Sequence, residues 1–199
     1  MLFALCIHEA SHAAMANWCG DPSARLLGRM TLNPLAHVDP IGTVVMPLLM
    51  MTSGSPFLIG WAKPVPVNPL NLRNMRRDQV LVALAGPGAN LTAAIVCAVI
   101  LRIGTIVGGV TTDQELFASP VLSMFLQLAV INVALLAFNL IPIPPLDGSW
   151  VLHYFLPPSG QQVLERIGPF GILLIILFGR SLIAIPFKLL LSLILLIAF

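Results

Sequence analysis

Three ionisable side chains lie within five residues of one another near the amino terminus: His8, Glu9 and His12. They belong to the string His-Glu-Ala-Ser-His, which has the pattern H-E-x-x-H. At about 3.6 residues per turn, a helix places the two histidines one turn apart on one face, where both imidazoles can bind a single metal ion. Glu9 is offset by about 100°, so its carboxylate can reach a water on the metal rather than the metal itself. The spacing therefore predicts a zinc site with an adjacent general base.

A third protein ligand is expected, because a catalytic zinc site takes three protein ligands and keeps one position open for water. The candidate is Asp147, in Asn-Leu-Ile-Pro-Ile-Pro-Pro-Leu-Asp-Gly at 139–148. The prolines break the preceding helix, and a broken helix can aim a carboxylate at a site inside a bundle. The alternative is an interfacial turn, since Asp-Gly is a common turn dipeptide.

The composition indicates the solvent that surrounds these residues. Of 199 residues, 58% are hydrophobic and 9% are charged, whereas soluble domains carry about 25% charged residues. We therefore expect an all-α integral membrane protein, a polytopic bundle of about four to five transmembrane helices. The net charge of +2 is small and scattered, which excludes a nucleic-acid-binding face. An ionisable side chain inside a membrane helix costs at least about 2.5–3.5 kcal/mol, which favours a functional origin of the 8–12 cluster over chance histidines packed on polar partners.

Four apolar stretches are expected to span the bilayer: about 1–19, 80–103, 121–140 and 167–185. The first is just long enough, because a helix of that length rises about 28 Å. The run 41–51 is short and contains Pro47, so we expect a re-entrant or interfacial segment near the active site. The segment 186–199 is too short to cross unless it continues the helix before it.

The basic residues predict the orientation of these segments. Provided that 41–51 does not cross, six of them share one side of the membrane, as the positive-inside rule prefers. They are Arg25, Arg29, Lys63, Arg73, Arg76 and Arg77. We expect that side to be cytoplasmic.

The 8–12 string and the 139–148 segment together resemble the site-2 protease family of intramembrane zinc metalloproteases, whose signatures are H-E-x-x-H and N-x-x-P-x-P-x-x-D-G. Two further stretches are similar to that family: Gly-Trp-Ala-Lys-Pro-Val-Pro-Val-Asn at 60–68 and Ala-Gly-Pro-Gly-Ala-Asn at 85–90. The likeness runs from Cys6 to about Leu156 and is closest to compact bacterial members without an inserted PDZ or CBS domain. Such members usually carry more sequence before the motif helix, so we expect a minimal first helix or a start at a downstream Met.

The resemblance implies one Zn²⁺ held by His8, His12 and Asp147, with Glu9 as the catalytic base. It also implies a multi-pass protein of the bacterial plasma membrane that cleaves transmembrane segments of other membrane proteins, as in regulated intramembrane proteolysis. One alternative is a non-proteolytic zinc-binding membrane protein, either a transporter or a scaffold; a transporter would spread its ionisable residues along a path, and an inactive homologue would be expected to lose Glu9. Another is a membrane zinc enzyme that acts on a small or lipid-linked substrate.

The stretch 60–69 offers a way to hold the substrate. Its prolines, Pro64, Pro66 and Pro69, favour an extended conformation, which could pair with an unwound substrate helix as an added strand. The alternative is a proline-rich connecting loop.

Further residues are candidates to bind substrate or support the site: Asn139, Asn90, Trp61, Lys63 and His37. Each amide could instead bond a neighbouring helix, a role worth about 0.6 kcal/mol in membranes. His37 has the alternative of being an ordinary loop histidine, and His153 is a weaker candidate still. Gly86 and Gly88, on either side of Pro87, are expected to permit close helix approach near the site.

Overall fold

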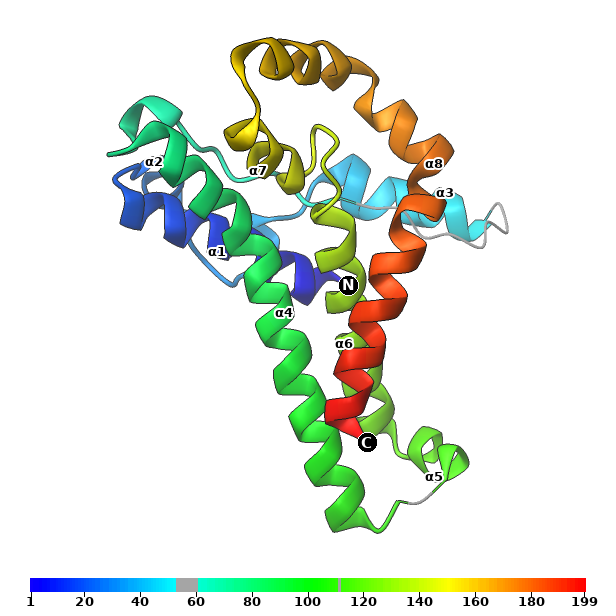
Figure 1. Ribbon diagram of the computed structural model, residues 1–199. Coiled ribbons are helices and arrows are strands. Elements are labelled where there is room, and N and C mark those ends of the chain that lie inside the picture. Colours follow the sequence, from blue (N-terminus) through cyan, green and yellow to red (C-terminus); the bar gives the residue numbers. More distant parts are fainter. Residues whose placement is uncertain (53–60, 111) are drawn as a thin grey trace. The chain divides into compact units, whose positions relative to one another are not determined.

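The computed structural model describes residues 1–52, 61–110 and 112–199. These residues divide into two compact units, Met1–Gly86 and Pro87–Phe199, and each unit is described by itself. The elements are α1 (Leu2–Cys19), α2 (Ser23–Leu26), η1 (Pro34–Ala36), η2 (Pro40–Val45), α3 (Met46–Thr52), η3 (Pro69–Asn71), α4 (Met75–Gly108), α5 (Asp113–Ala118), α6 (Pro120–Asn139), α7 (Asp147–Phe155) and α8 (Pro158–Ala198). Figure 1 labels the larger helices. The described chain contains helices and connecting segments, which confirms the all-α prediction.

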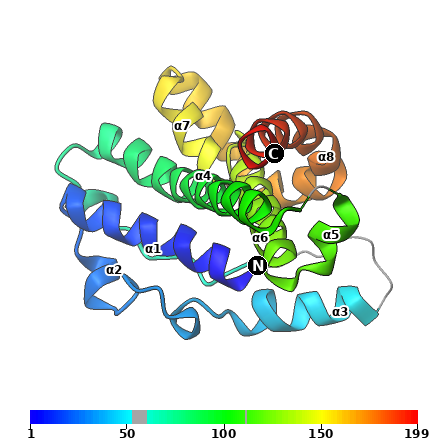
Figure 2. The ribbon, with the colours of Figure 1, turned by 90° about the horizontal axis from the view of Figure 1, so that it is seen from below.

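Helix α1 carries the H-E-x-x-H string and buries one of its faces. Its buried side chains include Leu5, His8, His12 and Ala16, which recur at the three- and four-residue spacing of one helix face. The helix ends at Gly20, whose φ of 115° requires a residue without a Cβ. In Figure 2 the chain that follows α1 returns alongside it, and both α2 and η1 contact α1.

The predicted re-entrant run falls on a short helical stretch. The π-helix η2 passes directly into α3, so that 40–52 forms one helical segment. Asp39 caps its start, since its Oδ1 accepts hydrogen bonds from the backbone N–H groups of Ile41 and Gly42. Whether the segment enters the membrane and returns stays a prediction.

The non-helical stretch expected at 60–69 is shorter in the structure and covers residues 61–68. Residue 60 lies outside the described residues. Trp61 to Asn68 form no helix, and the 3-10 turn η3 begins at Pro69. The turn starts there because Asn68 caps it, its side chain accepting a hydrogen bond from the Leu70 N–H at 3.1 Å. We call Trp61–Asn68 the 61–68 segment.

Helix α4 is longer than the predicted span at 80–103. It begins at Met75 because Asn74 and Asp78 form a reciprocal cap: the Asn74 side chain accepts from the Arg77 N–H at 3.2 Å, and Asp78 accepts from the Asn74 N–H at 2.8 Å. These polar residues are helical but lie outside the apolar run from which the span was predicted. The boundary between the two units falls within α4, at Gly86 and Pro87.

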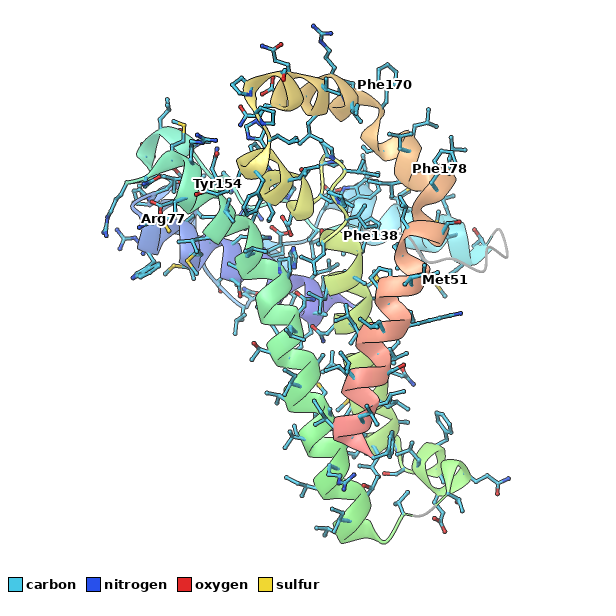
Figure 3. All side chains as sticks on the ribbon, in the orientation of Figure 1. Met51, Arg77, Phe138, Tyr154, Phe170 and Phe178 are labelled. Atoms are coloured by element: carbon cyan, nitrogen blue, oxygen red, sulfur yellow. The ribbon has the colours of Figure 1, made fainter. Side chains whose placement is uncertain are left out.

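The second unit has a core formed by α4, α6 and α8. Its buried side chains come from these three helices and from α5: Ala94, Cys97, Ala98 and Leu101 of α4, Leu116 of α5, Leu122, Ala129 and Val133 of α6, and Ile194 and Ala198 of α8. Figures 1 and 2 both show α6 and α8 side by side. Elsewhere on α8, Phe170 and Phe178 project away from the helix, and both are exposed (Figure 3). Small residues at the contacts and large apolar residues outside are typical of membrane helices.

Three helical stretches are long and apolar enough to cross a membrane: Met75–Gly108, Pro120–Asn139 and Ser181–Ala198. The last includes all but the final residue of the predicted short segment 186–199, which the structure shows as a continuation of the helix before it. Helix α1 is not among the three, because the polar side chains of His8, Glu9, His12 and Asn17 lower its mean hydropathy. The described residues therefore contain fewer candidate spans than the four to five expected.

Candidate metal centre

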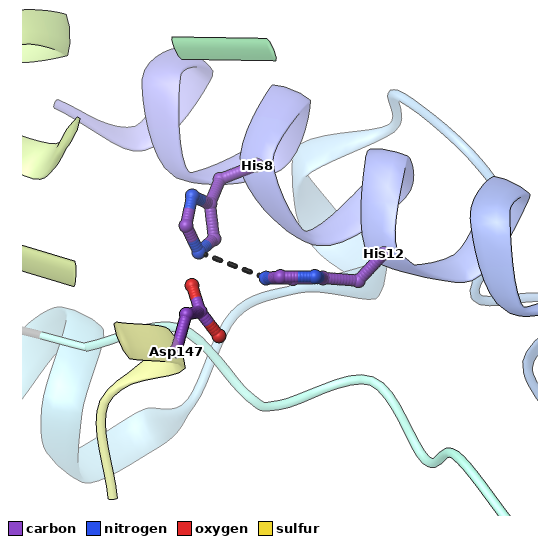
Figure 4. A group of neighbouring side chains, drawn as sticks. All are labelled: His8, His12 and Asp147. Atoms are coloured by element: carbon purple, nitrogen blue, oxygen red, sulfur yellow. Dashed lines mark hydrogen bonds between the residues drawn. The ribbon is translucent and has the colours of Figure 1, made fainter. Parts of the chain in front are cut away.

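The two histidines of α1 converge on each other. Their Nε2 atoms lie 3.0 Å apart (Figure 4), with ring centroids separated by 4.6 Å and ring planes at 86°. Both side chains are buried, at 4% and 8% exposure for His8 and His12. Zinc–nitrogen bonds of about 2.0–2.1 Å in a tetrahedral site put two ligand nitrogens about 3.3 Å apart. The observed separation fits two ligands of one ion after a small displacement.

A backbone carbonyl fixes the tautomer of His12. Its Nδ1 lies 2.7 Å from the carbonyl oxygen of Val82 on α4. Because a carbonyl oxygen only accepts hydrogen bonds, Nδ1 must carry the proton, and in the neutral ring Nε2 then presents a lone pair. This is the arrangement that orients histidine ligands in known metal sites. The sequence does not reveal this contact, since any residue at position 82 would supply a carbonyl.

Gly86 lets α4 approach the two imidazoles. A Cβ atom built on Gly86 would collide with the Nε2 of His12 and lie 2.6 Å from the Cε1 of His8. A Cβ on Gly88, two residues on, would meet no atom within 4 Å. The predicted packing role therefore belongs to Gly86 and not to Gly88.

Glu9 is held by the 61–68 segment. Its Oε2 accepts a hydrogen bond of 3.0 Å from the backbone N–H of Val65, and its side chain is half-buried. The other oxygen, Oε1, accepts no hydrogen bond from any residue in the described part of the chain. One oxygen thus orients the carboxylate while the other can accept a proton.

Asp147, in the second unit, is the first residue of α7 and is half-buried. The loop from Leu140 to Leu146 brings the chain back sharply after α6. A Cβ on Gly148 would collide with the carbonyl oxygen of Leu140, so glycine is required for this close return. The Ser149 hydroxyl closes the turn by donating to the Leu146 carbonyl at 2.7 Å. The local structure therefore fixes the backbone on both sides of Asp147, whose side chain is drawn in Figure 4.

The weaker candidates have different surroundings. Asn90 is fully buried on α4. Asn139 donates from Nδ2 to the carbonyl of Leu135 in its own helix, at 3.0 Å, which uses part of its hydrogen-bonding capacity locally. The Nε2 of His153 lies 3.6 Å from Oε1 of Glu165, in a partly exposed pair.

His37 is fully buried and joins two stretches of the first unit. Its Nε2 donates to the carbonyl oxygen of Thr31 at 2.8 Å, and its own carbonyl oxygen accepts from the Lys63 N–H at 2.9 Å. Trp61, also on the 61–68 segment, stacks so closely on Gly42 that a Cβ there would collide with the indole. The 61–68 segment contains Trp61 and Lys63 and is hydrogen-bonded to His37, so it connects these three candidate residues.

Asp21 is a fully buried carboxylate that belongs to none of the sequence motifs described above. It accepts hydrogen bonds from the Asn68 N–H at 2.7 Å, from Asn71 Nδ2 at 2.8 Å, and from both the N–H and the hydroxyl of Ser23. Burial raises the pKa of Asp21, but the hydrogen bonds from Asn71, Ser23 and Asn68 outweigh burial, so the pKa lies below its usual value. Asp21 anchors the far end of the 61–68 segment.

Apolar helices of membrane-spanning length and an H-E-x-x-H helix with converging imidazoles define an integral membrane protein of the zinc metallopeptidase class. Comparison with known proteins agrees. A model of a family described as Peptidase family M50 matches residues 102–178, which include Asp147. No solved structure matches the chain.

Three curated relatives cover most of this chain. "Putative zinc metalloprotease YwhC" of Bacillus subtilis (strain 168) is 34% identical over 182 residues, which are 89% of this chain and 77% of that protein. "Putative zinc metalloprotease Rip2" of Mycolicibacterium smegmatis is 30% identical over 179 residues, 88% of this chain and 62% of the relative. Rip2 of Mycobacterium tuberculosis (strain H37Rv) is 34% identical over 178 residues, 89% of this chain and 64% of the relative.

The chain therefore belongs to the site-2 protease family, peptidase family M50. It is a zinc metalloendopeptidase of the membrane. The donor atoms of α1 fit this metal, since neutral imidazole nitrogens are among the preferred ligands of zinc.

Proposed function

We propose that this protein hydrolyses peptide bonds in or near the transmembrane segments of other membrane proteins. His8, His12 and Asp147 bind one Zn²⁺, and Glu9 is the general base. The observation that carries the proposal is the 3.0 Å convergence of the two histidine Nε2 atoms on a helix that also holds Glu9, in a chain with three candidate membrane spans. A catalytic role in a zinc metalloprotease accounts for the cost of placing these ionisable side chains in a membrane protein.

The assignment of Asp147 as third ligand rests on its chemistry and its local structure. Two imidazoles and one carboxylate form a common donor set of catalytic zinc sites, and this set leaves one position open. Asp147 is half-buried at the start of α7, and Gly148 permits the close return of the backbone onto Leu140 at this point. His153, by contrast, is already paired with Glu165.

The zinc ion supplies Lewis-acid chemistry, which lowers the pKa of a bound water and polarises a carbonyl group. Glu9 takes the proton from the attacking water on Oε1, because Oε2 is engaged by the Val65 N–H at 3.0 Å. Glu9 then returns this proton to the nitrogen of the leaving amine. Val82 and Gly86 keep the His12 ring oriented during these steps.

The substrate must present an unwound segment, because the carbonyl groups of an intact helix are hydrogen-bonded within it. A proline-rich extended segment tied directly to Glu9 supports this requirement, since an unwound peptide can pair with such a segment as an added strand. We place the active site toward the cytoplasmic face of a bacterial plasma membrane, on the basis of the six basic residues within the first unit. Cleavage there would release a cytosolic piece of the substrate, as in regulated intramembrane proteolysis.

The test uses the purified full chain in lipid nanodiscs with a tagged single-span membrane protein as substrate. Glu9→Gln should reduce cleavage by at least about 1,000-fold while retaining one zinc ion per chain, because it removes the base and no ligand. Glu165→Gln, which changes an exposed glutamate in the same way, should cleave like wild type. Equal cleavage by Glu9→Gln and wild type would contradict the assigned mechanism. Zinc binding by wild type without cleavage of this substrate would contradict the proposed class of substrate.

A further inference from the structure

Glu9 receives its hydrogen bond from a stretch of backbone that is anchored on both sides. The Val65 N–H donates to Glu9 Oε2 at 3.0 Å. Two residues earlier, the Lys63 N–H donates to the His37 carbonyl oxygen at 2.9 Å, and three residues later the segment is anchored again by Asp21. The position of the Val65 N–H therefore depends on what holds the His37 carbonyl and the Asp21 carboxylate.

The loop 29–37 must hold the His37 carbonyl in place. Two hydrogen bonds join the beginning of this loop to its end: the Arg29 guanidinium donates to the Ala36 carbonyl, and His37 Nε2 donates to the Thr31 carbonyl at 2.8 Å. His37 is fully buried, whereas Arg29 is partly exposed. The imidazole is therefore the internal support of the loop that carries its own carbonyl.

The His37 ring acts on these surroundings through Nε2. Because the Thr31 carbonyl can only accept, Nε2 carries the proton, and Nδ1 receives no hydrogen bond from any group in the described part of the chain. His37 is also not a member of the candidate metal group that contains His8 and His12. Neither metal binding nor a second hydrogen bond among the described residues accounts for the ring, so its role is that of one donor at a defined distance from the backbone.

We propose that His37 is a positioning residue for the general base. Its Nε2–H closes the loop and thereby fixes its own carbonyl oxygen. That carbonyl holds Lys63, which sets the position of the N–H that Glu9 accepts two residues further on. The imidazole itself contacts neither substrate nor metal. This inference rests on the proposed function, because it concerns the base of that reaction, and small displacements of a catalytic group can lower the rate about 100-fold.

Two substitutions of His37 that differ in reach test the role of Nε2. The amide nitrogen of Gln lies as many bonds from Cβ as Nε2 does in histidine, whereas that of Asn lies one bond closer. With zinc-loaded full-length protein and the tagged single-span substrate, His37→Gln should keep kcat within about 3-fold of wild type. His37→Asn should lower kcat about 10- to 100-fold, with KM and zinc content unchanged. Equal kcat values for the two variants would overturn the role of Nε2.

A control on the same loop separates this role from general sensitivity of the loop. Leu35 is 80% exposed, and Leu35→Ala leaves the backbone hydrogen bonds of the loop intact. We expect Leu35→Ala to match wild type in kcat and KM. A loss of kcat as large as that of His37→Asn would show that any change in the loop is damaging, which would overturn the assignment to the imidazole.

A double-mutant cycle tests the route through Val65. Val65→Pro removes the N–H that Glu9 accepts. If His37 acts through this N–H, adding His37→Asn to Val65→Pro should lower kcat by less than about 2-fold further, because the contact that His37 maintains is already absent. A further loss of about 10-fold or more would show that His37 acts on another part of the protein and would overturn the inference.

Amide hydrogen exchange tests the same route without catalysis. NMR of the zinc-loaded full-length protein, isotope-labelled at Val and Lys, should show slow exchange at Lys63 and Val65, because both N–H groups are hydrogen-bonded. Val67 is the internal reference, since its N–H donates to no residue that the structure describes. His37→Asn should speed exchange at Lys63 and Val65 about 10-fold or more and leave Val67 unchanged, whereas His37→Gln should change none of the three.

The exchange experiment separates the inference from the proposed activity. Faster exchange at Lys63 with unchanged exchange at Val65 would overturn the positioning role and leave proteolysis standing. The expected exchange changes without any cleavage by wild type would support the positioning of the Glu9 carboxylate and overturn the proposed proteolysis. Unchanged exchange together with absent cleavage would overturn both.

Discussion

The Nδ1 of His12 lies 2.7 Å from the carbonyl oxygen of Val82, so α4 orients an imidazole that α1 carries. Four residues further along α4, Gly86 allows the helix to lie against both histidines. The two histidines therefore depend on one stretch of α4 in two ways. The Val82 carbonyl accepts a hydrogen bond from His12, and Gly86 has no side chain that would collide with the imidazoles.

Gly86→Ala should weaken zinc binding about 10- to 100-fold, because the added methyl group would push the His12 ring from its bond with Val82. A chelator competition titration of the detergent-solubilised protein measures this. Gly88→Ala is the matched control, since a Cβ there meets no atom within 4 Å. Similar zinc affinities for the two variants would show that Gly86 does not control the site.

Val65→Pro should lower kcat about 10- to 100-fold with zinc content unchanged, because it removes the N–H that orients the Glu9 carboxylate. The comparison is Val67→Pro, which removes an N–H that donates to no described residue. Steady-state cleavage and metal analysis of both variants provide the measurement. If Val65→Pro kept full kcat, the bond to Glu9 would have no catalytic role.

Asp21→Asn should lower thermal stability by several degrees at neutral pH. The pKa of Asp21 lies below its usual value of about 3.9, so its contribution is fully present above that value and is lost as the pH falls through the folded-state pKa. The difference in Tm between variant and wild type should therefore be largest above about pH 5 and should shrink below about pH 4. Glu165→Gln, which changes an exposed carboxylate, should show no pH-dependent difference in Tm from wild type. A Tm difference for Asp21→Asn that does not depend on pH would contradict the assignment.

Gly171→Ala should destabilise the second unit, because its Cβ would collide with the carbonyl oxygen of Pro144 in the loop before Asp147. On the same helix, a Cβ on Gly179 would make only an ordinary van der Waals contact, with Ile175 Cγ2 at 3.5 Å. We expect Tm to fall by about 4 °C or more for Gly171→Ala and to change little for Gly179→Ala. Thermal unfolding of both variants in detergent distinguishes them.

Local sequence signals predicted some elements well and others poorly. The helix α6, Pro120–Asn139, lies within one residue of the predicted span at each end, because Ser119 and Pro120 mark its start and the proline-rich loop follows its end. The start of α4 was missed because its cap is formed by polar residues outside the apolar run. The length of α8 was underestimated, since Pro169 and Pro186 both lie inside the helix.

The residues of the candidate site were likewise predictable only in part. The i, i+4 spacing of His8 and His12 predicted their convergence, because helix geometry alone brings these side chains together. The backbone groups of Val82 and Val65 could not be predicted, because every residue type supplies a carbonyl and nearly every type an N–H. Asp21 was missed for another reason: its partners Asn68 and Asn71 are distant in the sequence.

The ties on the 61–68 segment have a consequence for sequence variation. Trp61, Lys63, Val65 and Asn68 are each held through a backbone N–H. Many side chains are compatible with such a tie, but proline at any of these four positions would break it, whereas positions 62, 64 and 66 accept proline without loss of a bond. Orthologues can therefore differ widely in side chains along this stretch and still be recognised by where proline is allowed.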